Sequence, residues 1–135
     1  MADYAYRLDH RLMLVEVRLS GPKGTFDAEF VLDTGASYTI IDHRLAEYLG
    51  YSRKDAFSPS RVRSALGKEE GYRINIEAIE ALGKKFCPFQ VACHSLYEQG
   101  VAGLLGMTFL EQFDFCVFPS RQIIRVLHSS ACPQP

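Results

Sequence analysis

A period-two alternation of apolar and charged residues is the feature that most constrains the fold of this chain. Residues 11–19 and 25–32 both follow the pattern, with the apolar sets Met13, Val15, Val17, Leu19 and Phe26, Ala28, Phe30, Leu32. The sequence Gly-Pro-Lys-Gly separates the two segments at residues 21–24. Because successive side chains of a strand point to opposite faces, the pattern predicts a hairpin of two half-buried strands. The second strand leads directly into Asp33.

Short strands and turns dominate the remainder, so we expect a mainly β protein. Further strands are expected at residues 38–41, 61–65, 71–79, 86–93, 115–118 and 122–127. The strands at 61–65 and 71–79 carry few apolar residues and are joined through Leu66-Gly67-Lys68-Glu69. We therefore expect this hairpin to project from the body of the protein. Residues 4–8 are expected to meet residues 123–127 of the last strand.

Two short helices are expected. Asp42 is a candidate N-cap for a helix that ends at Gly50, with Leu45, Tyr48 and Leu49 on its apolar face. The second helix follows Gly106, where Thr108 and Glu111 have the spacing of a capping box.

Composition limits the classes of function. A chain of 135 residues with 47% hydrophobic residues can form one domain with a core. We expect that domain over residues 1–127 and a disordered tail over residues 128–135. The formal net charge of -1 gives no electrostatic reason to expect a nucleic-acid partner. No apolar run has the length of a signal peptide or membrane segment, so a cytoplasmic location is expected, with an anchored or exported parent protein left open.

Cysteine and histidine spacing does not indicate a metal site. Cys87, Cys93, Cys116 and Cys132 form no C-x-x-C motif, and the four histidines are scattered. We therefore expect no metal and no other cofactor, which disfavours a metal-dependent hydrolase. Cys87 and Cys93 share a face of one expected strand and are interpreted as small buried hydrophobic residues.

The sequence FVLDTGAS at residues 30–37 places an acid at the end of an apolar strand. A carboxylate buried there is costly unless it is hydrogen-bonded, and perturbed carboxylates gather at functional sites. Gly35 permits a sharp turn, and the Thr34 hydroxyl with nearby backbone N–H groups can hold the carboxylate. We therefore expect Asp33 to be a functional residue.

One carboxylate cannot act both as the base toward water and as the acid toward a leaving amine. Two carboxylates that share a proton can, because like charges a few Å apart do not ionise together. The chain contains one Asp-Thr-Gly. The second carboxylate is therefore expected from a second copy of the chain, related by a twofold axis.

The segments FVLDTGAS at 30–37 and GLLGMTFL at 103–110 resemble the retropepsin-like aspartic proteases, above all their bacterial single-domain members. The resemblance spans residues 11–127. It implies a mainly β, closed acid-protease barrel in which residues 104–106 lie beside the Asp33 loop and the hairpin at residues 61–76 is a flap. It also implies a homodimer with Asp33 of each subunit at the twofold axis.

The resemblance also implies roles for individual residues. Asp33 would be the catalytic acid and base, Thr34 would brace the two loops across the axis, and Gly35 would allow close approach. The substrate-binding residues would be Ala36 and Ser37 in the cleft, Leu66, Gly67 and Lys68 at the flap tip, and Leu105 in a side-chain pocket.

The expected function is that of an aspartic endopeptidase that cleaves extended peptides with hydrophobic residues beside the scissile bond. A non-catalytic homodimer that binds peptides in the same cleft is the alternative. The chain departs from the viral members of the family at Met107 and Thr108, where those usually carry an arginine and an acid or amide. This difference leaves open whether the subunits are joined by the viral charge network.

Overall fold

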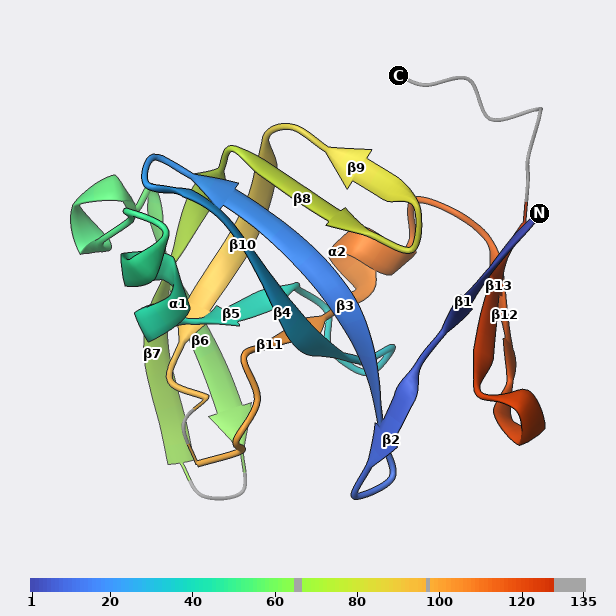
Figure 1. The fold of residues 1–135 in the computed structure, drawn as a ribbon. Helices are drawn as coiled ribbons and strands as arrows, with labels where there is room; N and C mark the ends of the chain where they lie inside the picture. Colours follow the sequence, from blue (N-terminus) through green and yellow to red (C-terminus); the bar gives the residue numbers. More distant parts are fainter. Residues whose placement is uncertain (65–66, 97, 128–135) are drawn as a thin grey trace.

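The computed structural model describes residues 1–64, 67–96 and 98–127, and these form a mainly β structure with two short α-helices (Figure 1). The strands are β1 (Ala2–Ala5), β2 (Arg7–Asp9), β3 (Leu12–Gly21), β4 (Gly24–Leu32), β5 (Ile40–Asp42), β6 (Ser58–Ser64), β7 (Gly67–Ile76), β8 (Ala78–Ala81), β9 (Lys84–Phe86), β10 (Phe89–His94), β11 (Gly103–Leu105), β12 (Phe115–Phe118) and β13 (Ile123–Val126). The helices are α1 (His43–Tyr48) and α2 (Met107–Leu110), with 3-10 turns η1 (Arg53–Asp55) and η2 (Pro119–Arg121). None of the helices in these ranges has the length and apolar character needed to cross a bilayer.

The hairpin expected from the alternating pattern is confirmed as β3 and β4. The strands pair antiparallel from Leu14 opposite Val31 to Gly21 opposite Gly24. Gly24 has φ +125°, a conformation that favours glycine. The apolar face is buried at Val15, Val17, Leu19 and Phe30. Phe26 is the exception on that face, because it is 39% exposed and packs edge-on against Tyr48 of α1.

The larger sheet has ten strands in the order β6-β7-β10-β5-β11-β4-β3-β8-β9, with β2 paired to β3. In its centre β11 runs parallel to β4 and antiparallel to β5. The closed barrel is wrong for the described ranges, because no pairing joins β6 to β9. Each of these end strands forms a hairpin with its neighbour in sequence, β6 with β7 and β9 with β8. The backbone groups on the other edge of each end strand pair with no described strand.

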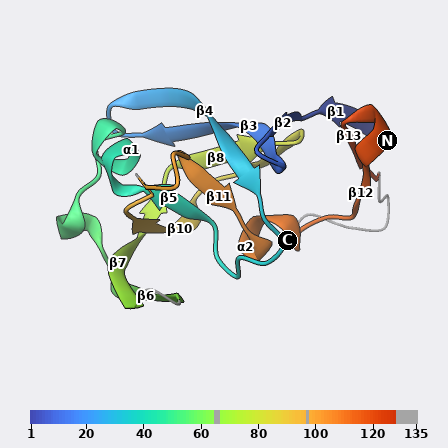
Figure 2. The same ribbon diagram turned by 90° about the horizontal axis from the view of Figure 1, so that it is seen from below.

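The predicted projecting hairpin is observed as β6 and β7. Its pairing runs from Ser58 opposite Arg73 to Ser64 opposite Gly67, and β7 joins the body through β10. Figures 1 and 2 show it at one end of the molecule, with the strands of the smaller sheet at the other. Residues 65–66, including Leu66 of the predicted tip, lie outside the described residues.

The smaller sheet joins the two ends of the described chain, in the order β1-β13-β12. The expected meeting of residues 4–8 with the last strand is confirmed for Tyr4 and Ala5, which lie opposite Ile124 and Ile123. It is wrong for Arg7 and Leu8, which belong to β2 and pair with β3. Arg125 donates two hydrogen bonds to Asp3, of 2.7 and 3.0 Å, and ties β13 to β1. Ile124 is fully buried and carries the inner face of the sheet into the core. The predicted tail at 128–135 lies outside the described residues.

Three local predictions are wrong. Tyr48 is 63% exposed, and Ala46 instead fills the buried face of α1 together with Leu49. Gly106, without a side-chain hydrogen bond, is the N-cap of α2, so Thr108 and Glu111 form no capping box. Cys87 is exposed while Cys93 is buried, because the expected single strand is divided into β9 and β10 at residues 87–88.

Candidate functional site

Asp33 lies where the buried strand β4 ends against β11. Leu105 of β11 is the parallel neighbour of Leu32. The Asp33 N–H donates a hydrogen bond of 3.0 Å to the Leu105 carbonyl. The chain then turns tightly, because the Gly35 N–H donates to Asp33 Oδ1 at 2.9 Å and the Ala36 N–H donates to the Asp33 carbonyl at 3.2 Å. These three hydrogen bonds fix the position of the Asp33 carboxyl at the end of β4. The Asp33 side chain is half-buried, not in the core as expected.

The remaining predicted residues divide into two groups. Thr34, Gly35 and Ser37 are exposed, and Ala36 is half-buried with its carbonyl accepting from Met107 N at 2.8 Å. The structure therefore brings residues 33–37 together with β11 and α2. Gly67 and Lys68 belong to β7, a separate element, where they pair with Ser64 and Arg63.

Leu105 contributes its backbone to the site. Its side chain is fully buried in the core, so the expectation that this side chain lines a substrate pocket is wrong for the structure described here. Strand alternation is the reason, since Leu105 points to the inner face of β11. Its neighbour Leu104 is half-buried and packs instead with the smaller cluster of Ile40, Ala92 and Leu96.

Hydrogen bonds between two threonines, Thr39 and Thr108, connect the loop that follows Asp33 to α2. Sequence reasoning missed this pair. Thr39 is fully buried, and its N–H donates to Thr108 Oγ1 at 2.9 Å. Thr108 Oγ1 donates to Thr39 Oγ1 at 3.1 Å, and Thr39 Oγ1 also accepts from the Gly106 N–H at 3.2 Å. A side chain at Gly106 would collide with the Tyr38 carbonyl. Thr39 was detectable as a polar residue beside the apolar pair Ile40-Ile41, but its partner was not.

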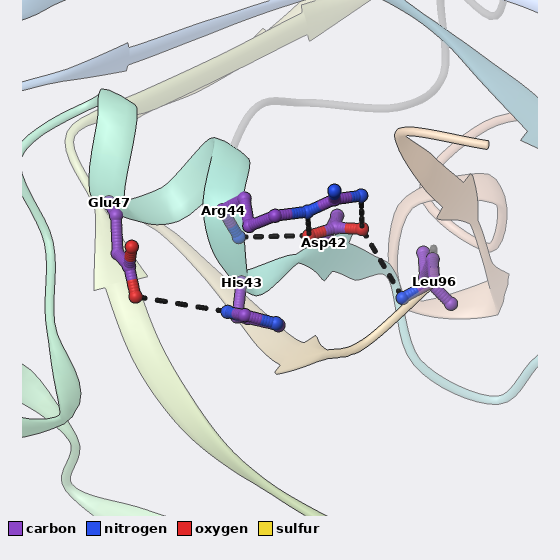
Figure 3. A network of polar contacts seen from close by, with 5 residues as sticks. All are labelled: Asp42, His43, Arg44, Glu47 and Leu96. Carbon is purple, nitrogen blue, oxygen red and sulfur yellow. Dashed lines mark hydrogen bonds and ion pairs between the residues drawn. The ribbon is translucent and has the colours of Figure 1, made fainter. Parts of the chain in front are cut away.

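The most deeply buried carboxylate of the described chain is Asp42, 3% exposed, and its role is structural (Figure 3). It accepts from the backbone N–H of Arg44 at 2.9 Å and of Leu96 at 3.3 Å, and from the Arg44 guanidinium at 3.1 and 3.2 Å. Burial alone would raise the pKa of Asp42, but the hydrogen bonds from Arg44 and Leu96 outweigh it and the pKa is lowered. His43 and Glu47 form a second contact on α1, 3.8 Å long.

A cavity of about 480 Å³ lies beside the strand that leads to Asp33. Its wall includes Leu14, which pairs with Val31, and the segment Val101–Ala102 that precedes β11. Arg7 and Glu29 at the same cavity form a two-fold hydrogen-bonded pair of 2.8 and 3.0 Å. Sequence reasoning did not identify these residues, because they come from distant segments and carry no motif.

Among the residues described, no group of His, Cys, Asp and Glu could hold a metal ion.

Comparison with known proteins identifies the family. Residues 17–112, more than half of the chain, match the family described as "gag-polyprotein putative aspartyl protease". No curated protein sequence matches the chain. Among solved structures, a retropepsin-like aspartic protease from Rickettsia conorii matches with a TM-score of 0.70 and 18% sequence identity, over 94% of this chain and 99% of that one. The chain therefore belongs to the gag-polyprotein aspartyl protease family, and its fold is that of the retropepsin-like proteases.

Proposed function

We propose that the protein is an aspartic endopeptidase that acts as a homodimer, with one Asp33 from each subunit in a shared active site. The observation that carries the proposal is the Asp33 loop, in which an intact Asp-Thr-Gly is held against β11 with Asp33 Oδ1 accepting from the Gly35 N–H. The family supports hydrolysis of peptide bonds as the chemistry. A half-buried carboxyl in each subunit is compatible with a site that a second copy completes.

The proposed mechanism uses two carboxyl groups and one water. The two Asp33 carboxyls share a proton, and the ionised one takes a proton from the water as its oxygen attacks the scissile carbonyl. The protonated carboxyl donates a hydrogen bond to the carbonyl oxygen as negative charge develops there. Collapse of the tetrahedral species breaks the C–N bond, and a proton passes to the departing nitrogen. No covalent bond forms between enzyme and substrate.

The β6–β7 hairpin is proposed as the flap over the substrate. It joins the body through one strand, β10, and its pairing extends outward to Ser64 and Gly67. A hairpin held at one end can move as a unit, exclude water and offer backbone hydrogen bonds to an extended peptide. Gly67 and Lys68 are its proposed contacts, and Ala36 and Ser37 are the proposed contacts on the opposite wall.

The substitution Asp33→Asn tests the proposal. We expect kcat/KM toward a peptide library to fall about a thousandfold or more, because an amide cannot act as general base. The matched control is Asp27→Asn on β4, the strand that leads to Asp33, where the carboxylate is exposed and pairs with Arg18 at 2.8 Å. Exposed pairs contribute little, so this variant should keep its activity.

Cleavage is measured by mass spectrometry of products at mildly acid pH. Parental activity in Asp33→Asn would contradict the proposal. Peptide binding without cleavage by the wild-type protein, and without inhibition by transition-state mimics, would instead favour the non-catalytic peptide-binding dimer.

A further inference from the structure

A stacked pair joins the candidate flap to the Asp33 loop. The guanidinium carbon of Arg73, on β7, lies 4.4 Å from the centre of the Tyr38 ring. Tyr38 is five residues beyond Asp33, and its carbonyl packs against Gly106 at the start of α2. The ring is 39% exposed. The pair thus lies between the two elements that would contact a peptide under the proposed function.

Arg73 differs from the other arginines whose side chains the structure describes. Arg73 and Arg125 are half-buried, and the others are exposed. Arg125 is paired with Asp3 through two hydrogen bonds. Arg73 forms no ion pair or side-chain hydrogen bond with any described residue, and its Nε is buried without an acceptor. A half-buried cation without an anion is costly, and a ligand that carries negative charge would offset that cost.

A second polar group without a partner lies next to it. Ser58 is directly opposite Arg73 in the β6–β7 register, so the two side chains share a face of the hairpin. The Ser58 hydroxyl is also buried with no hydrogen-bond partner among the described residues. A guanidinium stacked on a ring keeps its N–H donors in the plane, directed away from the ring. Three features therefore converge: a positive charge, in-plane donors and a neighbouring hydroxyl.

We propose that Arg73, stacked on Tyr38 and flanked by Ser58, binds a side-chain carboxylate of the substrate peptide. The inference rests on the proposed function and adds a substrate class to it, namely peptides with an aspartate or glutamate at one position near the scissile bond. A carboxylate is the matching ligand because it accepts two parallel hydrogen bonds from a guanidinium. The hydrophobic preference expected from sequence then applies to the other positions.

Arg53, in the 3-10 turn η1, provides a matched comparison because it stacks on a tyrosine of the same hairpin. Its guanidinium carbon lies 5.0 Å from the ring of Tyr72, the residue before Arg73. Because successive side chains of a strand alternate, Tyr72 and Arg73 point to opposite faces of β7. Arg53 is exposed, so its charge is solvated and needs no ligand. Arg53→Gln removes an arginine stacked on a tyrosine without altering the proposed site.

The test compares peptides that differ only by Asp or Glu against Asn or Gln, at each position on both sides of the cut. For the wild-type protein we expect kcat/KM to favour the acid about tenfold or more at one position. Arg73→Gln should abolish that preference, Arg73→Lys should keep part of it, and Arg73→Glu should reverse it, so that the amide peptide is cleaved better than the acidic one. Arg53→Gln should keep the wild-type preference. Equal selectivity in wild type and Arg73→Gln would overturn the inference.

A binding measurement separates this inference from the proposed function. Calorimetry on Asp33→Asn should give tighter binding of the acidic peptide than of its amide counterpart, and Arg73→Gln in that background should remove the difference. This result would stand even if the wild-type protein cleaved nothing. Equal binding of the two peptides, or no binding of either, would overturn the inference while leaving Asp33 chemistry to the cleavage assay. If Arg73→Gln lost dimerisation but kept its selectivity, the carboxylate that pairs with Arg73 would belong to the partner subunit and not to the substrate. This result would also overturn the inference.

Discussion

At the scale of residues, position in a hydrogen-bond network decides function more than burial does. Asp42 is almost fully buried, yet its carboxylate is saturated by Arg44 and Leu96 and serves the fold. Asp33 is half-buried, and among the described residues its carboxyl accepts one hydrogen bond, from the Gly35 N–H. An acid available for chemistry keeps unfilled acceptor positions, and Asp33 has them. The sequence argument for Asp33 was wrong about the depth of its burial, and the assignment of Asp33 as a functional residue stays a prediction.

Thr108 is predicted to be a positioning residue for Asp33. Thr108→Val removes the acceptor of the Thr39 N–H and the donor to Thr39 Oγ1, at nearly constant volume. We expect kcat to fall about tenfold with KM nearly unchanged, because the loop loses its rear support while the cleft keeps its shape. The free energy of unfolding should fall by about 1–3 kcal/mol, since a buried N–H is left without a partner.

Thr108→Ser keeps the hydroxyl and should restore kcat. Thr25→Val, at an exposed position of β4, is the control and should change neither kcat nor stability by much. Steady-state kinetics and denaturant unfolding measure the two effects. A change in stability with unchanged kcat would limit Thr108 to a structural role.

At the scale of elements, strands with a clear alternation or a clear turn were predictable from the sequence. Pairings between strands that are far apart in the sequence were not. The β3–β4 hairpin follows from the period-two pattern, because one register alone buries Val15, Val17 and Phe30 together. The parallel pairing of β11 with β4 depends on residues more than seventy positions apart and was implied only by the family resemblance. The Thr39–Thr108 contact has the same long range, which is why Thr108 was misread as a local cap.

Asp42 ties α1 to the segment after β10, and this tie should weaken in acid. The pKa of Asp42 in the folded protein is below its ordinary value of 3.8. Its contribution to stability is therefore present above pH 3.8 and is lost as the pH falls through the folded-state pKa. We expect Asp42→Asn to be less stable than wild type at neutral pH, with the difference narrowing below about pH 4.

Denaturant unfolding of both proteins between neutral pH and pH 3 measures this narrowing. Asp27→Asn is the control: its pKa is also lowered, by Arg18, but the pair is exposed and should contribute little. A difference between Asp42→Asn and wild type that stays constant over the whole pH range would contradict the assignment.

At the scale of the whole molecule, the two ends of the described chain meet in one sheet. β1, β13 and β12 pair within one chain, and the Asp3–Arg125 hydrogen bonds lie between two of them. Each chain carries one Asp-Thr-Gly, and the proposed function takes the second Asp33 from another copy. On this account the dimer is required for catalysis, and a single chain can fold before it pairs.

Mixing wild-type protein with Asp33→Asn is the measurement that tests the central claim most directly. With the wild-type concentration fixed and the variant in increasing excess, subunits exchange into mixed dimers that contain one carboxyl and one amide. We predict that activity per wild-type chain falls toward zero as the excess grows. Activity that stays constant at every ratio, in samples where capture of an affinity-tagged variant also retains wild-type chains, would contradict a site shared between two copies of Asp33.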